Sequence, residues 1–407
     1  MPVVYALRED LDLLSADPAR APATGLFCEW EGEDVVHLRL RPPLHAYGRT
    51  GPCLFLHCPP PSPPPPTAVP DGIEWVAAWH VSPDGPALRA FRRVPGGPFS
   101  ETSVQFVPAR SELHSRARGI LEADALAARR VAIVGLGSFG SQIAVELAKA
   151  GVGSFALFDF DRVELHNLMR HVCGVNDLGR LKTDAIRDAI LAKNPYAAVD
   201  RFPVDINADR RLLSAETARA DLVICATDNN RSRFSVQSAL LAHGKTGLFG
   251  RAVTRAEGGD VFRHRPGGPC YCCLVGTGWY NANDEELADL ASARRSGRIP
   301  AYVSPADAEA AVQVGLSADI APICNFLVKL ALVELARGTS SALDSLDAEL
   351  VHDYWLWANR RERHYANWGP FPSAGSKPAI LRWYGAFIQR RPDCPYCAPE
   401  PEPDAAP

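Results

Sequence analysis

Hydrophobic and polar positions alternate along the chain with more than one period. Between residues 131 and 338, short apolar runs (VAIVG, SFALFDF, DLVICAT) alternate with segments of helical periodicity (GSQIAVELAKA, KTDAIRDAILAK). Strands that alternate with helices in this way predict a doubly wound, mainly parallel sheet. The apolar segment at residues 317–338 predicts a buried helix that Gly338 closes. We therefore expect an α/β domain with a Rossmann-like sheet.

Residues 1–110 show a different pattern, in which short apolar runs (GLFCEW, VVHLRL, CLFLHC, WVAAWHV) are separated by turn-rich polar stretches. This spacing predicts a small β-rich or α+β domain. The run CPPPSPPPPTAVP at residues 58–70, which holds eight prolines, interrupts this pattern. Because proline cannot join a sheet ladder, we expect an extended loop there. A domain of this kind could dock a partner or a substrate.

The other boundaries follow from composition. Residues 111–338, which open with a helical segment, are expected to form the α/β domain. Within them, the polar and small-residue-rich stretch at about 281–311 predicts a long surface excursion. Residues 339–400 are expected to form a C-terminal unit, and residues 401–407 a disordered acidic, proline-rich tail.

Composition and charge exclude several classes of protein. Of the 407 residues, 47% are hydrophobic and 22% are charged, as in soluble globular proteins. The net charge of −4 gives no electrostatic reason to expect nucleic acid or an anionic membrane as a partner. No apolar run approaches the roughly 18–20 residues of a membrane span, and acidic residues appear too early for a signal peptide. We expect a cytoplasmic protein.

The first candidate for chemistry is the glycine loop GLGSFG, which directly follows the strand VAIVG. Gly135 and Gly137 permit a tight turn and a close approach of backbone N–H groups to phosphate, and Gly140 lets the next helix pack on the strand. Asp159 ends the second strand, where it can accept hydrogen bonds from a ribose, and we assign Asp161 to the same site. These residues fit NAD as well as ATP.

Three polar residues favour ATP. Asn167, Arg170 and Lys182 fall in the connection after the second strand, over the carboxyl edge of the sheet where the phosphates must lie. Two cations and an amide there can hold the α- and β-phosphates and neutralise a pyrophosphate leaving group. The alternative is that each forms a surface salt bridge.

A carboxylate and an amide end a later strand of the same sheet. Asp228 follows the strand DLVICAT, where it is a natural ligand for Mg²⁺ bridging ATP phosphates, and we place Asn229 beside it. Asp228 could instead cap the helix that begins at Asn230, or serve in both roles.

Together these motifs resemble the ThiF/MoeB/ubiquitin-activating superfamily over about residues 111–338. The resemblance rests on GLGSFG, DFDRVELHNLMRH, GRLK, NP and ATDN and on their joint spacing. It implies an enzyme that adenylates the C-terminal carboxylate of a protein or peptide with Mg-ATP and releases pyrophosphate. Ser138 departs from the glycine that many members have at its position.

The resemblance also implies roles for individual residues. Asp159 would bind ribose, Asp228 would hold the metal, and three residues would contact the phosphates: Asn167, Arg170 and Lys182. An arginine upstream of the first strand would reach the nucleotide of a partner subunit, which implies a homodimer. Of Arg116 and Arg118, we prefer Arg118 for this role.

Two cysteine pairs predict a structural zinc site. Cys270 and Cys273 form one knuckle and Cys394 and Cys397 another, each preceded by turn residues that let both sulfurs face one ion. Such a site would pin the C-terminal unit to the nucleotide domain. Cys272 is left over, and a register that uses it is the alternative.

A catalytic cysteine, which ubiquitin-activating enzymes have, is harder to assign. The excursion contains none, and Cys324 falls inside an apolar helix pattern that favours a buried thiol. Cys272 would be reactive only if it were neither buried nor metal-bound. These two are weak candidates.

Three functions remain open. The first is activation of a small ubiquitin-like protein, with transfer to a thiol of the enzyme itself or of a conjugating partner. The second is adenylation of a peptide or sulfur-carrier protein in natural-product or cofactor maturation. The third is an NAD-binding Rossmann protein, against which Arg170, Lys182 and Asp228 argue.

Overall fold

The computed structural model divides the chain into two compact units, Met1–Arg116 and Ala117–Pro407. It describes residues 2–30, 32–41, 48–61, 69–93, 98–107, 113–117, 119–121, 123–253, 256–276, 315–339, 341–361 and 379–398. Four regions named above lie wholly or partly outside these residues: Arg118, the proline-rich loop, the excursion at 281–311 and the tail at 401–407.

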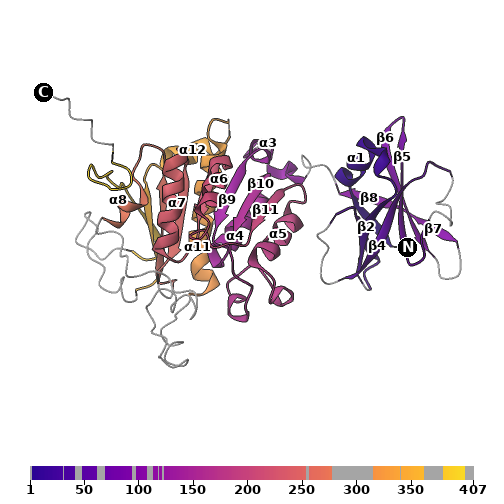
Figure 1. Ribbon diagram of the computed structural model, residues 1–407, viewed down its shortest axis with the longest axis horizontal. Helices are drawn as coiled ribbons and strands as arrows, with labels where there is room; N and C mark the ends of the chain where they lie inside the picture. The colour runs from indigo at the N-terminus through magenta and orange to yellow at the C-terminus, as the bar shows by residue number, and fades with distance from the viewer. Residues whose placement is uncertain are drawn as a thin grey trace. The chain divides into compact units, whose positions relative to one another are not determined.

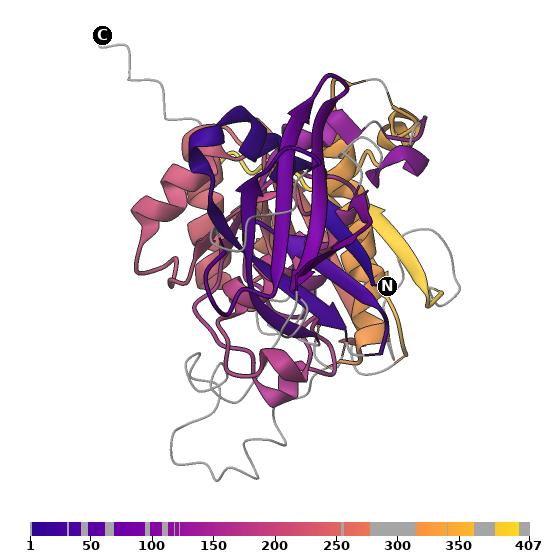
Figure 2. The ribbon, with the colours of Figure 1, turned by 90° about the vertical axis from the view of Figure 1, so that its right-hand side faces the viewer.

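The first unit is built on one eight-stranded sheet in the order β7-β6-β5-β4-β2-β3-β1-β8. Its strands are β1 (Val3–Leu7), β2 (Ala23–Trp30), β3 (Val35–Arg39), β4 (Arg49–His57), β5 (Trp75–Ser82), β6 (Gly85–Arg93), β7 (Phe99–Thr102) and β8 (Val104–Val107). The sheet is mixed, because β1 runs parallel to β3 and β8, and β4 runs parallel to β5. Figure 2 shows its strands as indigo to purple arrows. The prediction of a strand-rich N-terminal region is confirmed.

One helix accompanies this sheet among the described residues, α1 (Arg8–Ala16). Its Leu11 and Leu14 pack with Trp75 and Trp79 of β5 in a buried cluster, which forms because alternate residues of a strand face the same side. Short 3-10 turns lie at Pro18–Arg20 and Ser115–Ala117.

The second unit contains a second eight-stranded sheet in the order β11-β10-β9-β12-β13-β14-β15-β16. Its strands are β9 (Arg130–Val134), β10 (Ser154–Phe158), β11 (Ala198–Phe202), β12 (Leu222–Cys225), β13 (Gly247–Ala252), β14 (Gly258–His264), β15 (Tyr354–Ala358) and β16 (Arg382–Ala386). The neighbouring strands β11, β10, β9, β12 and β13 are parallel, as predicted. Strands β14, β15 and β16 extend the sheet beyond β13, and each is antiparallel to the strand before it.

Helices cover both faces of this sheet (Figure 1). They are α3 (Ala123–Ala127), α4 (Ser138–Lys149), α5 (Lys182–Lys193), α6 (Arg210–Arg219), α7 (Asn230–His243), α8 (Tyr271–Val275), α11 (Ser317–Ala336) and α12 (Asp344–Glu349). Val131 and Ile133 of β9 belong to the cluster of α4, α5 and α11, whereas Ala132 and Val134 belong to that of α6, α7 and α8. This alternation gives the sheet two buried faces.

The apolar segment that predicted a buried helix forms α11, which ends at Ala336 just before Gly338, whose φ is +81°. No described helix is long and apolar enough to cross a membrane.

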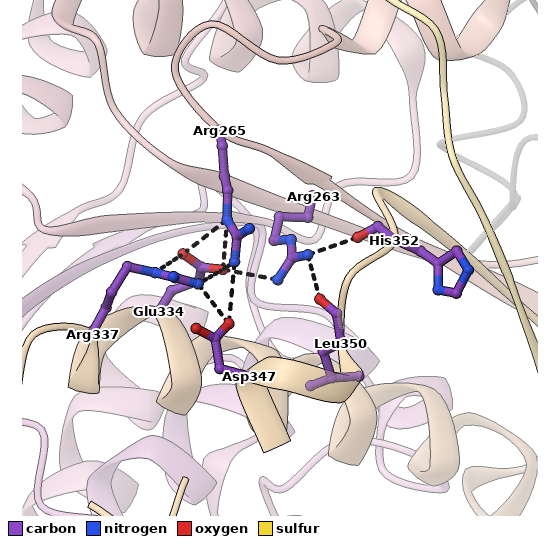
Figure 3. Close-up of polar contacts among 7 residues, drawn as sticks. All are labelled: Arg263, Arg265, Glu334, Arg337, Asp347, Leu350 and His352. Carbon is purple, nitrogen blue, oxygen red and sulfur yellow. Dashed lines mark hydrogen bonds and ion pairs between the residues drawn. The ribbon is translucent and has the colours of Figure 1, made fainter. Parts of the chain in front are cut away.

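An ionic network centred on the buried pair of Arg263 and Glu334 fixes α11 to the sheet (Figure 3). Glu334 of α11 accepts hydrogen bonds from Arg263 at 3.0 Å and Arg265 at 2.6 Å. Arg263 also donates to the carbonyl oxygens of Leu350 and His352, at 2.6 and 2.7 Å. One buried guanidinium thereby joins α11, β14 and the segment that leads into β15.

Candidate nucleotide-binding site

A cavity of about 450 Å³ opens at the carboxyl ends of β9, β10 and β12. In a doubly wound sheet this edge is where ligands bind, because the strand order reverses there and the loops diverge. The structure brings nine of the predicted site residues to its wall: Gly135, Gly137, Asp159, Asp161, Asn167, Arg170, Lys182, Asp228 and Asn229.

The glycine loop forms the floor between β9 and α4. Gly135 has a φ of +88°, a conformation that L side chains rarely adopt. A Cβ on Gly140 would lie 1.8 Å from the carbonyl oxygen of Gly135, so the helix can approach the loop only because this residue is glycine. A Cβ on Gly137 would meet no atom within 4 Å, which leaves open space beside the loop.

The start of α4 offers donors to an anion. The first N–H groups of a helix point toward its N-terminus, which here lies at the cavity. The N-cap residue is Gly137, so no capping side chain accepts a hydrogen bond from these groups. The Ser138 hydroxyl, buried at the cavity wall, makes no hydrogen bond to any described residue. A phosphate oxygen would satisfy it, and the residues present therefore fit a nucleotide.

Asp159 orders the loop as well as facing the cavity. One carboxylate oxygen accepts the backbone N–H of Leu136 at 2.7 Å, and the other accepts that of Asp161 at 2.8 Å. Each oxygen retains a lone pair that a ribose hydroxyl could use. Desolvation by the surrounding residues raises the pKa of Asp159, and the nearby Lys182 ammonium opposes this shift.

Two buried cations face the same space. The side chain of Lys182, the first residue of α5, lies with its Nζ 3.0 Å from Asp161 Oδ2. Lys182 and Arg170 are only 7% and 5% exposed. Buried cations at a cavity wall favour an anionic ligand, since desolvation strengthens their attraction to negative charge. Asn167 is turned partly to its own loop, where its Oδ1 accepts the N–H of Glu164 at 3.0 Å.

His171 is a site residue that the sequence prediction missed. It lines the cavity next to Arg170, and its Nδ1 accepts the backbone N–H of Cys173 at 3.2 Å. Its Nε2 therefore carries the proton and donates to the Leu136 carbonyl at 2.6 Å. Burial lowers the pKa of His171 to about 4, so the ring is neutral at physiological pH. The sequence feature that could have predicted this role is the position of His171 directly after Arg170, in the run HNLMRH.

The structure separates the two roles considered for Asp228. The cap of α7 is Asn229, whose Oδ1 accepts the N–H of Ser232 at 2.9 Å. Asp228 lines the cavity, and its Oδ1 accepts from Asn229 Nδ2 at 3.2 Å. The alternative role of Asp228 as the helix cap is therefore wrong, because the cap lies one residue later. A carboxylate at this place suits Mg²⁺.

Residues that follow β11 also line the cavity, although the sequence did not predict this. Asp205 and Asn207 line the cavity, and Asn207 joins the α7 side through hydrogen bonds to Ser232 at 3.1 Å and Ser235 at 2.8 Å. The available signal was the polar run DINAD after a strand, at the same edge of the sheet as the glycine loop.

The four predicted zinc ligands form one buried cluster. The Sγ atoms of Cys270, Cys273, Cys394 and Cys397 all lie within 4.8 Å of one another. Cys270 Sγ is 3.5 Å from Cys394 Sγ, and Cys273 Sγ is 3.5 Å from Cys397 Sγ. Zinc–sulfur bonds of about 2.3 Å in a tetrahedron place sulfurs about 3.8 Å apart, so the cluster fits zinc.

Neither candidate nucleophile is a fully exposed thiol. Cys324 is 1% exposed within α11. Cys272 is partly exposed, and its pKa is raised to about 11 by burial and by the neighbouring Cys394.

Several known proteins are similar to this chain. The ThiF family matches residues 112–346, which is more than half of the chain. Molybdopterin-synthase adenylyltransferase of Escherichia coli is 40% identical over 153 residues, which cover 37% of this chain and 60% of that protein. Sulfur carrier protein adenylyltransferase of Thermus thermophilus is 35% identical over 151 residues, covering 35% of this chain and 54% of that protein.

Two further similarities are more distant. Ubiquitin-like modifier-activating enzyme 5 of Caenorhabditis elegans is 29% identical over 157 residues, covering 36% of this chain and 37% of that protein. The crystal structure of Escherichia coli MccB with MccA-N7isoASN has 19% identity and a TM-score of 0.48, over 68% of this chain and 69% of that one. The matched part thus spans at most about 60% of the length of these curated relatives. The family match, together with the geometry of the glycine loop and its cavity, shows that this chain belongs to the ThiF family.

Proposed function

We propose that this protein adenylates the C-terminal carboxylate of a small protein or peptide with Mg-ATP and releases pyrophosphate. The observation that carries the proposal is the meeting of Lys182, Arg170 and Asp228 with the glycine loop in one cavity. A hydride-transfer site has no need of two buried cations and a carboxylate beside the phosphates. Membership of the ThiF family further disfavours the NAD-binding alternative.

The chemistry is substitution at the α-phosphorus. A carboxylate oxygen of the substrate attacks that phosphorus, the bond to the bridging oxygen of the β-phosphate breaks, and pyrophosphate leaves with its electron pair. Lys182 and Arg170 would neutralise the charge that grows on the leaving group. The N–H groups at the start of α4 would hold phosphate oxygens, and Asp159 would orient the ribose. Asp228 would hold Mg²⁺, which supplies further charge neutralisation when bound.

We propose a small ubiquitin-like protein as the substrate. The relatives support a carrier or modifier protein, since they include a sulfur carrier protein adenylyltransferase and a ubiquitin-like modifier-activating enzyme. A peptide or a sulfur carrier is the alternative. The acyl group would then pass to a thiol of a conjugating partner or of the enzyme itself, and the burial of Cys324 within α11 favours the partner.

We also propose a homodimer in which Arg118 reaches the partner's nucleotide. Exposed apolar side chains between β10 and α5, beside the cavity, support a subunit contact: Phe160, Leu165, Met169 and Val175 are 47%, 73%, 54% and 64% exposed. Isolated apolar residues on a surface are ordinary, but four within 16 residues favour an interface. Light scattering after size-exclusion chromatography tests this, and a monomer at micromolar concentration would contradict it.

ATP–pyrophosphate exchange tests the adenylation itself, with a Gly-terminated ubiquitin-like protein, a sulfur carrier and a short peptide as separate candidate substrates. Exchange with the first and not the others supports the proposed substrate. Exchange with the peptide alone would replace it with the alternative.

A further inference from the structure

Tyr271 touches both the cysteine cluster and the wall of the nucleotide cavity. It lies between Cys270 and Cys272 in α8, which lies beside α7 (Figure 1). Its hydroxyl donates to Asn230 Oδ1 at 2.6 Å, and its backbone N–H donates to Gln237 Oε1 at 2.9 Å. Asn230 is the first residue of α7 and lines the cavity.

The packing around Tyr271 leaves its ring little freedom. The residue is 1% exposed, and its ring stacks on Phe249 with centroids 5.2 Å apart. Phe234 meets it edge-on at 5.3 Å and also packs against Tyr396, at 5.2 Å. Tyr396 lies between Cys394 and Cys397, so both cysteine knuckles contribute to the position of Tyr271.

Further hydrogen bonds continue from Asn230 to the backbone that carries Asp228. Asn230 Oδ1 also accepts from Arg233 Nη1 at 3.4 Å, and Arg233 Nη2 donates to the carbonyl of Thr227 at 2.6 Å. Arg233 is only 2% exposed. Thr227 and Asn230 bracket Asp228, and all three line the cavity.

We infer that Tyr271 is a positioning residue through which the four-cysteine cluster holds the loop Thr227–Asn230, and with it Asp228, in the geometry that binds nucleotide. The cysteine cluster holds α8 in place, and α8 carries Tyr271. The Tyr271 hydroxyl then holds the start of α7 through its hydrogen bond to Asn230. The zinc site is then coupled to the nucleotide site rather than being only a clamp for the C-terminal strands. The catalytic consequence, unlike the coupling itself, rests on the proposed adenylation.

The test replaces Tyr271 with phenylalanine, which keeps the ring and removes the hydroxyl. Amide hydrogen exchange of residues 227–233 should quicken, and the Kd for Mg-ATP should rise by about threefold to tenfold, the usual range for one hydrogen bond. The zinc content should stay that of the wild type. The matched control is Tyr396→Phe, which removes a hydroxyl from the other knuckle and should change none of these.

A second variant tests the same coupling by removing one of the four cysteines. Cys394→Ser should lower the zinc content and quicken exchange in residues 227–233, and combining it with Tyr271→Phe should add less than the sum of the two effects. Unchanged exchange of residues 227–233 in Tyr271→Phe would overturn the inference, whatever the enzymatic activity. Absence of ATP binding by the wild type would instead overturn the proposed function, and the exchange data would still decide the coupling.

Discussion

Lys182 and Asp161 are joined twice: Nζ of Lys182 lies 3.0 Å from Oδ2 of Asp161, and the backbone N–H of Lys182 donates to the Asp161 carbonyl at 3.0 Å. The first contact holds the ammonium at the cavity wall before any nucleotide arrives. The second ties the start of α5 to the residues that follow β10. A side chain held in this way loses little conformational entropy when it meets a phosphate.

Asp161→Asn should therefore slow adenylation, because Asp161 holds the Lys182 ammonium at the cavity wall. The amide preserves the size of the side chain but weakens the hold on the ammonium. We expect a rate reduction of about tenfold, since a hydrogen bond between charged groups contributes about 1.5–3 kcal/mol. Pyrophosphate exchange at saturating ATP measures it, with Glu164→Gln, an exposed carboxylate of the same connection, as the control. Equal rates for Asp161→Asn and the wild type would contradict this role.

Two glycines of one loop should respond differently to alanine. Gly140→Ala places a Cβ 1.8 Å from the Gly135 carbonyl oxygen, and we expect a loss of about 1–3 kcal/mol in the free energy of unfolding. Gly137→Ala meets no atom within 4 Å and should keep wild-type stability within about 0.5 kcal/mol. It should still weaken ATP binding, because its methyl group enters the space beside the loop. Denaturant unfolding measures the effect on stability, and nucleotide titration measures the effect on ATP binding. Equal free energies of unfolding for Gly140→Ala and Gly137→Ala would refute the packing argument.

Much of this site could be predicted from the sequence because its signals are local. The glycine loop, Asp159 and Lys182 each stand at a fixed distance from a strand end, and the parallel sheet brings those ends together. The antiparallel strands β14 to β16 and the Tyr271–Asn230 hydrogen bond could not be predicted. They depend on partners far apart in the sequence, and pairing of this kind leaves no periodic pattern.

The neutral state of His171 predicts a pH dependence of stability. Burial lowers its pKa from 6.5 to about 4, so the unfolded chain takes up a proton at this residue before the folded chain does. The contribution of the neutral His171 to the free energy of unfolding is fully present above about pH 6.5. It is lost as the pH falls toward 4, by at most about 1.4 kcal/mol per pH unit. His171→Asn should lose stability less steeply in this window.

The comparison between His171→Asn and the wild type is the control for other groups. Asp159, whose raised pKa gives an opposite dependence, is present in both proteins and cancels in their difference. Thermal unfolding at pH 7.5, 6.5, 5.5 and 4.5 provides the measurement. Parallel profiles for the two proteins would show that His171 is not buried neutral.

The ionic network of α11 should contribute to stability and not to catalysis. Glu334→Gln would leave the Arg263 guanidinium, whose side chain is 1% exposed, without its carboxylate. Breaking a buried pair in this way costs about 3–5 kcal/mol. Glu146→Gln removes an exposed pair with Lys149 and should change stability by less than about 0.5 kcal/mol. Equal denaturation midpoints for the two variants would contradict the stabilising role of the network.

The central claim is that Lys182 and Asp228 serve adenylation in the cavity beside the glycine loop. ATP–pyrophosphate exchange with a responsive carboxylate substrate tests it most directly, using the wild type, Lys182→Ala, Asp228→Ala and the exposed control Lys193→Ala from the far end of α5. We predict that exchange falls at least about a hundredfold in the first two variants, the usual effect of removing a group that stabilises transition-state charge, and persists in the third. Exchange at the wild-type rate in both Lys182→Ala and Asp228→Ala would contradict the account.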